Sequence, residues 1–145
     1  MAHPVQLEQQ QDFQFAVRFG EGVPTLLTDE HPPLGEGAGP SPDQLLAAAV
    51  GNCMSASLLF ALRKFKQAPE PIRTEVEATQ GRNEANRLRV LRIAVRITLG
   101  VPAANLQHLD RVLSQFEQFC TVGESVRQGI PVDVEVYDST GARLK

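Results

Sequence analysis

The chain contains one long apolar segment, over residues 45–62, in which nearly every position is hydrophobic or small. Ser41, Pro42 and Gln44 precede it in the pattern of a helix N-terminus, with a Ser cap, a Pro at the first helical position and a Gln that reaches back to the cap. The pattern predicts one helix over residues 39–66. Because this helix is apolar on almost every side, we expect it to be covered on every side, by more than one chain if necessary.

Other segments alternate apolar and polar residues with the period of half-buried strands. The predicted strands cover residues 13–19, 23–28, 72–79, 87–98 and 132–137. A change of phase near residues 89–91 predicts a bulge. The polar residues 1–11 predict a loose N-terminal segment, and the Pro- and Gly-rich residues 29–39 predict a loop.

Two further helices are expected between the last strands. The first opens at Pro102 and carries an apolar stripe that ends at Cys120. The second begins with Thr121 and Glu124 as a capping box and ends at Gly129. Hairpins and helices are therefore segregated, which predicts an α+β fold with a mainly antiparallel sheet in a single domain over residues 1–145.

Composition narrows the possible functions. The chain is 42% hydrophobic and 21% charged, as in ordinary globular proteins, and its net charge of −3 offers no basic excess for binding nucleic acid. The polar N-terminus does not resemble a signal peptide, and the helix over 39–66 contains polar residues, which favours burial over a membrane span. We therefore expect a cytoplasmic protein with neither nucleic acid nor membrane as a partner.

The chain has two cysteines, Cys53 in the long helix and Cys120 at the end of the apolar stripe. If they meet, one thiol can attack an oxidant and become a sulfenic acid, which the other converts to a disulfide. Two inert buried cysteines are the alternative. The three histidines have no metal-ligand spacing to either cysteine, so no metal or cofactor is expected.

The segment Pro40–Cys53, PSPDQLLAAAVGNC, resembles the first cysteine motif of the OsmC/Ohr family of osmotically inducible and organic hydroperoxide resistance proteins. The segment Cys120–Val126, CTVGESV, is similar to the second motif, and the resemblance spans about residues 13–137. The family consists of thiol-dependent peroxidases that reduce organic and fatty-acid hydroperoxides. Its members are intertwined homodimers with active sites at the subunit interface.

The resemblance implies that Cys53 is the peroxidatic thiol and Cys120 the resolving thiol, with an external dithiol as reductant. Asp43 holds the place of the acidic residue, usually Glu, that the family carries ten positions before the first cysteine. Arg18, near the N-terminal turn, is the candidate for the arginine that stabilises the family's thiolate. Asp43 and Cys53 are ~15 Å apart along a helix, so we expect a two-fold to bring Asp43 of one chain to Cys53 of the other.

Apolar neighbours would favour a bulky organic hydroperoxide, and the candidates are Leu46, Met54, Phe60 and Phe116, although core packing is the commoner role for such residues. Two other functions remain open. One is an OsmC-like dimer that has lost turnover and binds an apolar ligand in its interface cleft. The other is a structural domain with inert thiols.

Overall fold

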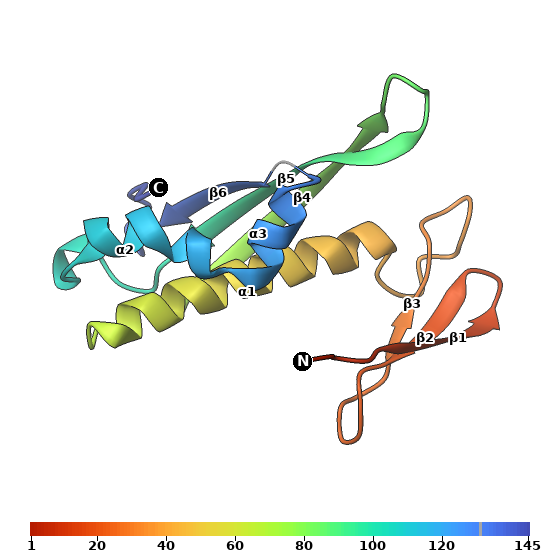
Figure 1. Ribbon diagram of the computed structural model, residues 1–145, viewed down its shortest axis with the longest axis horizontal. Helices are drawn as coiled ribbons and strands as arrows, with labels where there is room; N and C mark the ends of the chain where they lie inside the picture. The colour runs from red at the N-terminus through yellow and green to blue at the C-terminus, as the bar shows by residue number, and fades with distance from the viewer. Residues whose placement is uncertain (131) are drawn as a thin grey trace. The chain divides into compact units, whose positions relative to one another are not determined.

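The computed structural model describes residues 1–130 and 132–145, and for Val132 only the backbone (Figure 1). The chain divides into two compact units, residues 1–46 and 47–145, and the long helix α1 (Pro42–Lys64) runs from one into the other. The elements form an α+β fold with antiparallel pairing and a long helix, as predicted. The assignment of residues 1–145 to a single domain stays a prediction.

The first unit contains a three-stranded antiparallel sheet of β1 (Gln6–Gln11), β2 (Gln14–Arg18) and β3 (Leu26–Thr28). The prediction of a loose segment over residues 1–11 is wrong for β1, which pairs with β2 along its length. All six residues of β1 are exposed, so this strand has no buried face and no apolar alternation to reveal it. Backbone hydrogen bonds to β2 hold it in place.

Helix α1 begins as the sequence predicts. The backbone N–H of Ser41 donates to the Gln44 side chain at 2.9 Å, and the Gln44 N–H faces the Ser41 hydroxyl at 3.4 Å, which completes the capping box. The helix ends at Lys64, and Lys66 then adopts a left-handed conformation that turns the chain away. This helix positions Cys53 near its middle.

The expectation that α1 is covered on every side is not met within this chain. Its buried face includes Val50, Met54 and Leu58. Among the described residues, a row of side chains spaced four residues apart stays exposed. The row consists of Ala48, Asn52, Ala56 and Phe60. By length and composition α1 could also span a membrane, with a mean hydropathy of 1.9, a test that core helices pass as well.

The second unit is built on a sheet with the order β4 (Arg73–Arg82), β5 (Leu88–Thr98) and β6 (Val132–Tyr137). Strands β4 and β5 are antiparallel, and their pairing steps from Thr79↔Arg92 to Gln80↔Val90. Leu91 is therefore the extra residue, which confirms the predicted bulge. Strand β6 lies parallel to β5, a pairing that alternation alone does not reveal.

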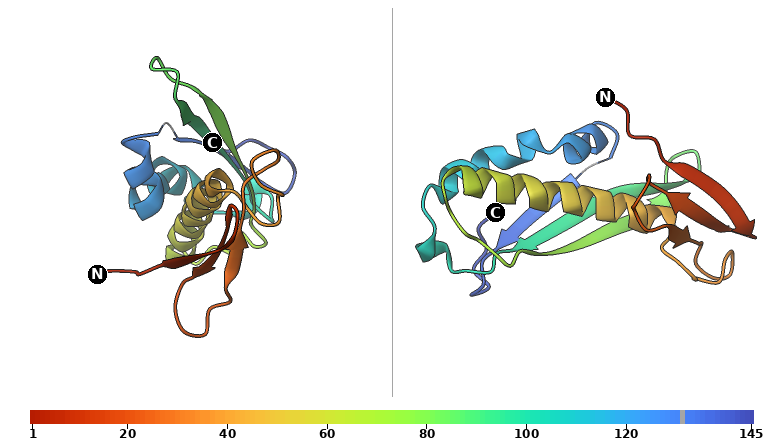
Figure 2. Two further views of the ribbon diagram at one scale, coloured as in Figure 1. Left: turned by 90° about the vertical axis from the view of Figure 1, so that its right-hand side faces the viewer. Right: turned by 90° about the horizontal axis from the view of Figure 1, so that it is seen from below.

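The two faces of this sheet differ in character. Ile93, Val95 and Ile97 of β5 are buried in the core on one face. Figure 2 shows α1 running along the sheet within this unit. On the other face Arg96 pairs with Glu135 of β6 at 3.2 Å, so the arginines of β5 belong to a solvated, salt-bridged surface.

The helix predicted to run from Pro102 to Cys120 is interrupted. A short 3₁₀ turn (Ala103–Asn105) comes first, then α2 (Leu109–Gln115), then a second 3₁₀ turn, η2 (Phe116–Phe119). The helix is interrupted because His108, directly before α2, adopts a left-handed backbone conformation with φ 59° that a right-handed helix cannot contain. The short helix α3 (Thr121–Arg127) follows η2.

Asp138, which follows β6, ties the end of the chain to the start of the 3₁₀ turn. Its carboxylate is 2% exposed and accepts from the Ala103 N–H at 2.7 Å and from the Thr140 hydroxyl at 2.6 Å. These hydrogen bonds, the Thr140 hydroxyl first, hold the pKa of Asp138 below its usual 3.8. The carboxylate thus stabilises the fold above pH 3.8, and this stability is lost as the pH falls through its lowered folded-state pKa.

We therefore expect Asp138→Asn to lower the melting temperature by several degrees at pH 7 and to flatten the loss of stability below pH 4. Thermal unfolding followed by circular dichroism from pH 2 to pH 7 measures both effects. Glu84→Gln, in the exposed turn between β4 and β5, is the control and should leave the curve unchanged. Parallel acid unfolding curves for wild type and Asp138→Asn would contradict the prediction.

Candidate functional site

Cys53 lies in the middle of α1, on the side of the helix that meets α3. Its thiol is half-buried, and the backbone N–H of Val122 donates to Cys53 Sγ at 3.4 Å. Val122 is the second residue of α3, where backbone N–H groups have no partner within the helix. The first turn of α3 therefore offers the Cys53 sulfur one backbone hydrogen-bond donor.

Cys120 is the N-cap residue of α3. Its Sγ accepts a hydrogen bond from the Gly123 N–H at 3.2 Å, and the side chain is fully buried. The predicted capping box, with Thr121 as the cap, is therefore wrong by one residue. Thr121 lies inside the helix, and the cysteine itself takes the capping position that Ser or Thr commonly occupies.

The two thiols are brought together. Burial raises the pKa of the Cys120 thiol to about 11, its hydrogen bond with the Cys53 side chain adds to the rise, and the Gly123 N–H and the Ser57 side chain oppose it. A thiol with this pKa keeps its proton at neutral pH. Cys120 is thus placed to donate that proton to the sulfur of Cys53.

Gly123 makes this close arrangement possible. A Cβ atom at this position would lie 2.2 Å from Cε of Met54 and 2.9 Å from Sγ of Cys120. Met54 is fully buried beside Cys53 on α1, so it has little room to move. Glycine therefore lets the first turn of α3 approach α1 closely enough for the Val122 N–H to reach Cys53 Sγ.

Ser57 is a polar group of the site that sequence reasoning missed. It lies one helical turn after Cys53, its side chain hydrogen bonds with Cys120, and it also lines a cavity of about 160 Å³. The spacing of four residues from Cys53 is the signal that could have identified it. Ser57 thus connects the thiols to the cavity.

The cavity is mostly apolar, and four phenylalanines line it. Its walls include Phe60, Phe65, Phe116 and Phe119, and two cations, Lys64 and Arg111, also line it. Lys64 Nζ lies 5.8 Å from the centre of the Phe60 ring, and Arg111 Cζ lies 5.8 Å from that of Phe65. Neither cation forms an ion pair with any residue that the structure describes. The cavity therefore suits an apolar ligand that carries a negative charge.

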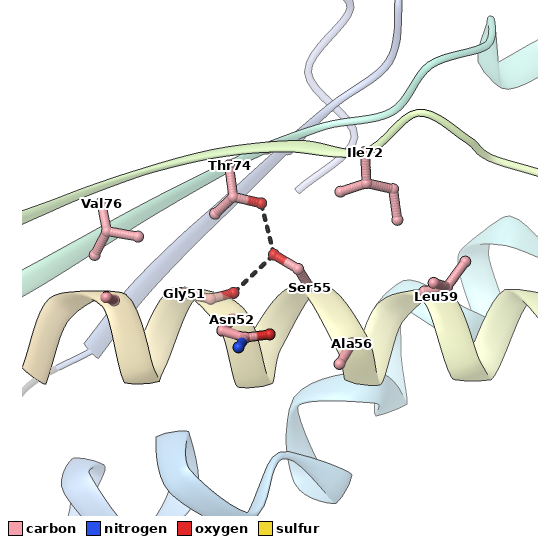
Figure 3. A pocket seen from close by; sticks show the side chains of 9 residues that line it. Gly51, Asn52, Ser55, Ala56, Leu59, Ile72, Thr74 and Val76 are labelled. Carbon is pink, nitrogen blue, oxygen red and sulfur yellow. Dashed lines mark hydrogen bonds between the residues drawn. The ribbon is translucent and has the colours of Figure 1, made fainter. Parts of the chain in front are cut away.

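A second hollow, of about 440 Å³, lies between α1 and β4 (Figure 3). Ser55 Oγ connects its two walls. It lies 2.7 Å from the Gly51 carbonyl oxygen of α1 and 2.6 Å from Thr74 Oγ1 of β4. No ionisable residue is among the described residues that line the hollow, so it offers no acid or base to activate the Ser55 hydroxyl. It includes the exposed Asn52 and Ala56 of α1.

The other two candidate site residues lie in the first unit. Arg18, at the end of β2, pairs with Glu8 of β1, with 3.0 Å between Nη1 and Oε2, and Asp43 lies in the first turn of α1. Their proposed roles at the thiols stay predictions. No group of three or more His, Cys, Asp or Glu among residues 1–130 and 132–145 could hold a metal ion.

Comparisons with known proteins find the same fold in solved structures. A comparison with curated protein sequences found no match. Among solved structures, an OsmC-like protein of unknown function from Vibrio cholerae is 18% identical, with a TM-score of 0.79 over 94% of this chain and 99% of that one. Organic hydroperoxide resistance proteins from Elizabethkingia anophelis and Legionella pneumophila also share the fold. The first is 14% identical, with a TM-score of 0.74 over 96% of this chain and 99% of that one, and the second is 15% identical, with 0.71 over 94% and 97%.

The sequence itself matches the family model for OsmC-like proteins over residues 35–135. This match covers more than half of the chain and includes both cysteines, which confirms the resemblance found in the sequence. The chain therefore belongs to the OsmC-like protein family.

Proposed function

We propose that this protein is a cytoplasmic thiol peroxidase that reduces organic hydroperoxides. Membership of a family that includes hydroperoxide resistance proteins supports a redox role. The observation that carries the proposal is that both sulfurs lie at the first turn of α3, where the Val122 N–H donates to Cys53 Sγ at 3.4 Å and the adjacent Gly123 N–H donates to Cys120 Sγ at 3.2 Å.

The reaction begins with Cys53 as a thiolate, because only this form attacks the peroxide oxygen. Cys53 takes the terminal oxygen of the hydroperoxide and becomes a sulfenic acid, and the organic product leaves as an alkoxide that is protonated to an alcohol. Cys120 then attacks the sulfenic sulfur, which forms a disulfide and releases water. An external dithiol reduces this disulfide and returns both thiols.

Exposure and protonation assign the two roles. Cys53 is half-buried and therefore reachable by a substrate, whereas Cys120 is fully buried. The raised pKa of Cys120 keeps it protonated at neutral pH, so it is a poor nucleophile toward the hydroperoxide. Cys120 therefore does not compete for the hydroperoxide but lies next to the sulfur that it must capture.

A homodimer completes the proposal. The exposed row on α1 consists of small residues and one large apolar residue, Phe60, which suits close packing against a second copy of the helix. In such a dimer Asp43 of one chain could approach Cys53 of the other, with Arg18 supplying the cation. Analytical ultracentrifugation and the Asp43→Asn and Arg18→Ala variants test these assignments.

The aromatic cavity next to Ser57 sets the expected substrate class. We expect Lys64→Gln combined with Arg111→Gln to lower kcat/KM roughly five- to tenfold for a hydroperoxide that carries a carboxylate, because two exposed charges stabilise that group only modestly. The kcat/KM for neutral cumene hydroperoxide should stay within about twofold of wild type. Arg63→Gln removes a cation that pairs with Glu70 outside the cavity and is the matched control. An equal loss for both substrates would contradict the role of the two cations.

Mass spectrometry before and after one equivalent of an organic hydroperoxide tests the proposed function. We expect one alcohol per chain and a disulfide that links the peptides of Cys53 and Cys120. If the protein consumes no hydroperoxide, the proposal fails. The aromatic cavity would then favour the second candidate, an OsmC-like dimer that binds an apolar ligand without turnover. Saturable binding of a fatty acid, measured by isothermal titration calorimetry, would support that candidate.

A further inference from the structure

A cluster of charged side chains that the proposed reaction does not use lies on the elements before and after Cys120. It consists of Glu117 in η2, Glu124 and Arg127 in α3, and Lys145. Arg127 Nη2 lies 2.6 Å from Glu117 Oε2, and Arg127 Nε lies 3.0 Å from Glu124 Oε1. One guanidinium therefore bridges two carboxylates, a geometry to which the planar fork of arginine is suited.

The two bridged residues, Glu117 and Glu124, also form backbone hydrogen bonds with Cys120. The Cys120 N–H donates to the Glu117 carbonyl oxygen at 3.0 Å, and the Glu124 N–H donates to the Cys120 carbonyl oxygen at 3.0 Å. The backbone of Cys120 is thus bonded on both sides to residues whose side chains Arg127 holds together. We call the bridge from Glu117 through Arg127 to Glu124 the clamp.

Within the cluster, the pair of Glu117 and Arg127 is better shielded than the exposed ion pair of Glu70 and Arg63. The side chains of Glu117 and Arg127 are 20% and 35% exposed, compared with 41% and 62% for Glu70 and Arg63 in an exposed pair. Glu117 is also held at its other carboxylate oxygen by Lys145 Nζ, at 2.6 Å, which in turn donates to the Leu113 carbonyl at 3.0 Å. Shielded charges that form a network contribute more than isolated exposed pairs.

We propose that Arg127 is a positioning residue for the resolving thiol. It holds η2 and α3 at the angle that keeps Cys120 in contact with Cys53, so that Cys120 captures the sulfenic acid before a second hydroperoxide reacts. Two reactions compete for this sulfenic acid. Cys120 forms the disulfide and releases water, whereas a second hydroperoxide transfers an oxygen atom to give the sulfinic acid and an alcohol. The inference rests on the proposed function.

The experiment measures the hydroperoxide concentration at which half of Cys53 ends as sulfinic acid, by mass spectrometry of the full chain. For Arg127→Gln we expect this concentration to fall on the order of tenfold, since small displacements of reacting groups cost large factors in rate. The rate of the first hydroperoxide reaction at Cys53 should stay within about twofold of wild type, because Arg127 binds Glu117 and Glu124 and acts on the segment that carries Cys120. Arg127→Lys should recover part of the loss, since it keeps the charge without the fork.

Arg63→Gln is the matched control, because it removes one arginine from an exposed ion pair of the same unit. Circular dichroism verifies that each variant is folded, and if Arg127→Gln is not, Glu124→Gln opens half of the clamp and decides the question. If the folded variants reach half sulfinic acid at the same hydroperoxide concentration as wild type, the proposed role of Arg127 is wrong. If wild type forms the disulfide and the variants match it, only this inference fails. If wild type forms no disulfide, the proposed function fails as well.

Discussion

Cys53→Ser is expected to abolish turnover of organic hydroperoxides, with a loss of roughly a thousandfold or more, as for removal of other enzyme nucleophiles. A serine hydroxyl keeps its proton at neutral pH and is a far weaker nucleophile toward peroxide oxygen than a thiolate. The substitution is nearly isosteric and lies at a half-buried position, so the fold should persist. Initial rates with cumene hydroperoxide and a dithiol reductant measure the loss.

The control for this variant is a second serine substitution in the same protein. Cys120→Ser should still consume one hydroperoxide per chain, whereas Cys53→Ser should consume none. Residual turnover above about a hundredth of wild type in Cys53→Ser would mean that Cys120 reacts directly with the hydroperoxide. The burial of Cys120 and its retained proton argue against that outcome.

Several features of the fold could be predicted from the sequence because their signals are local. The helix cap at Ser41 and Gln44 is formed, and the break in alternation around Leu91 is a bulge. These features depend on side chains and backbone within a few residues, or on two paired strands. Alternation could not predict β1, because a strand with both faces exposed has no apolar period.

The fine structure of the site could not be predicted in the same way. The interruption of the helix after Pro102 depends on His108, whose ring stacks on Phe65 with 4.8 Å between the ring centres, a contact that is distant in sequence. The capping role of Cys120 and the space left by Gly123 depend on how closely α3 approaches Met54. The positions of both thiols were visible in the sequence, but the groups that tune them come from tertiary packing.

Cys120→Ser is expected to separate the two steps of the proposed cycle. Serine is a good N-cap, so its hydroxyl can accept from the Gly123 N–H in place of the thiol and α3 should remain formed. The first hydroperoxide should therefore react at a rate within about threefold of wild type. Without a resolving thiol, the sulfenic acid at Cys53 then waits for an external thiol, and excess hydroperoxide converts it irreversibly to sulfinic acid.

The measurement is the number of turnovers before inactivation at a fixed excess of hydroperoxide, and we expect it to fall at least about tenfold in Cys120→Ser. Cys120→Ala is the companion variant, because it removes both the thiol and the cap. If loss of the cap alone mattered, only Cys120→Ala would inactivate early, and Cys120→Ser would match wild type. Early inactivation of both variants, with sulfinic acid found only at Cys53, follows if capture by the Cys120 sulfur is what protects the enzyme.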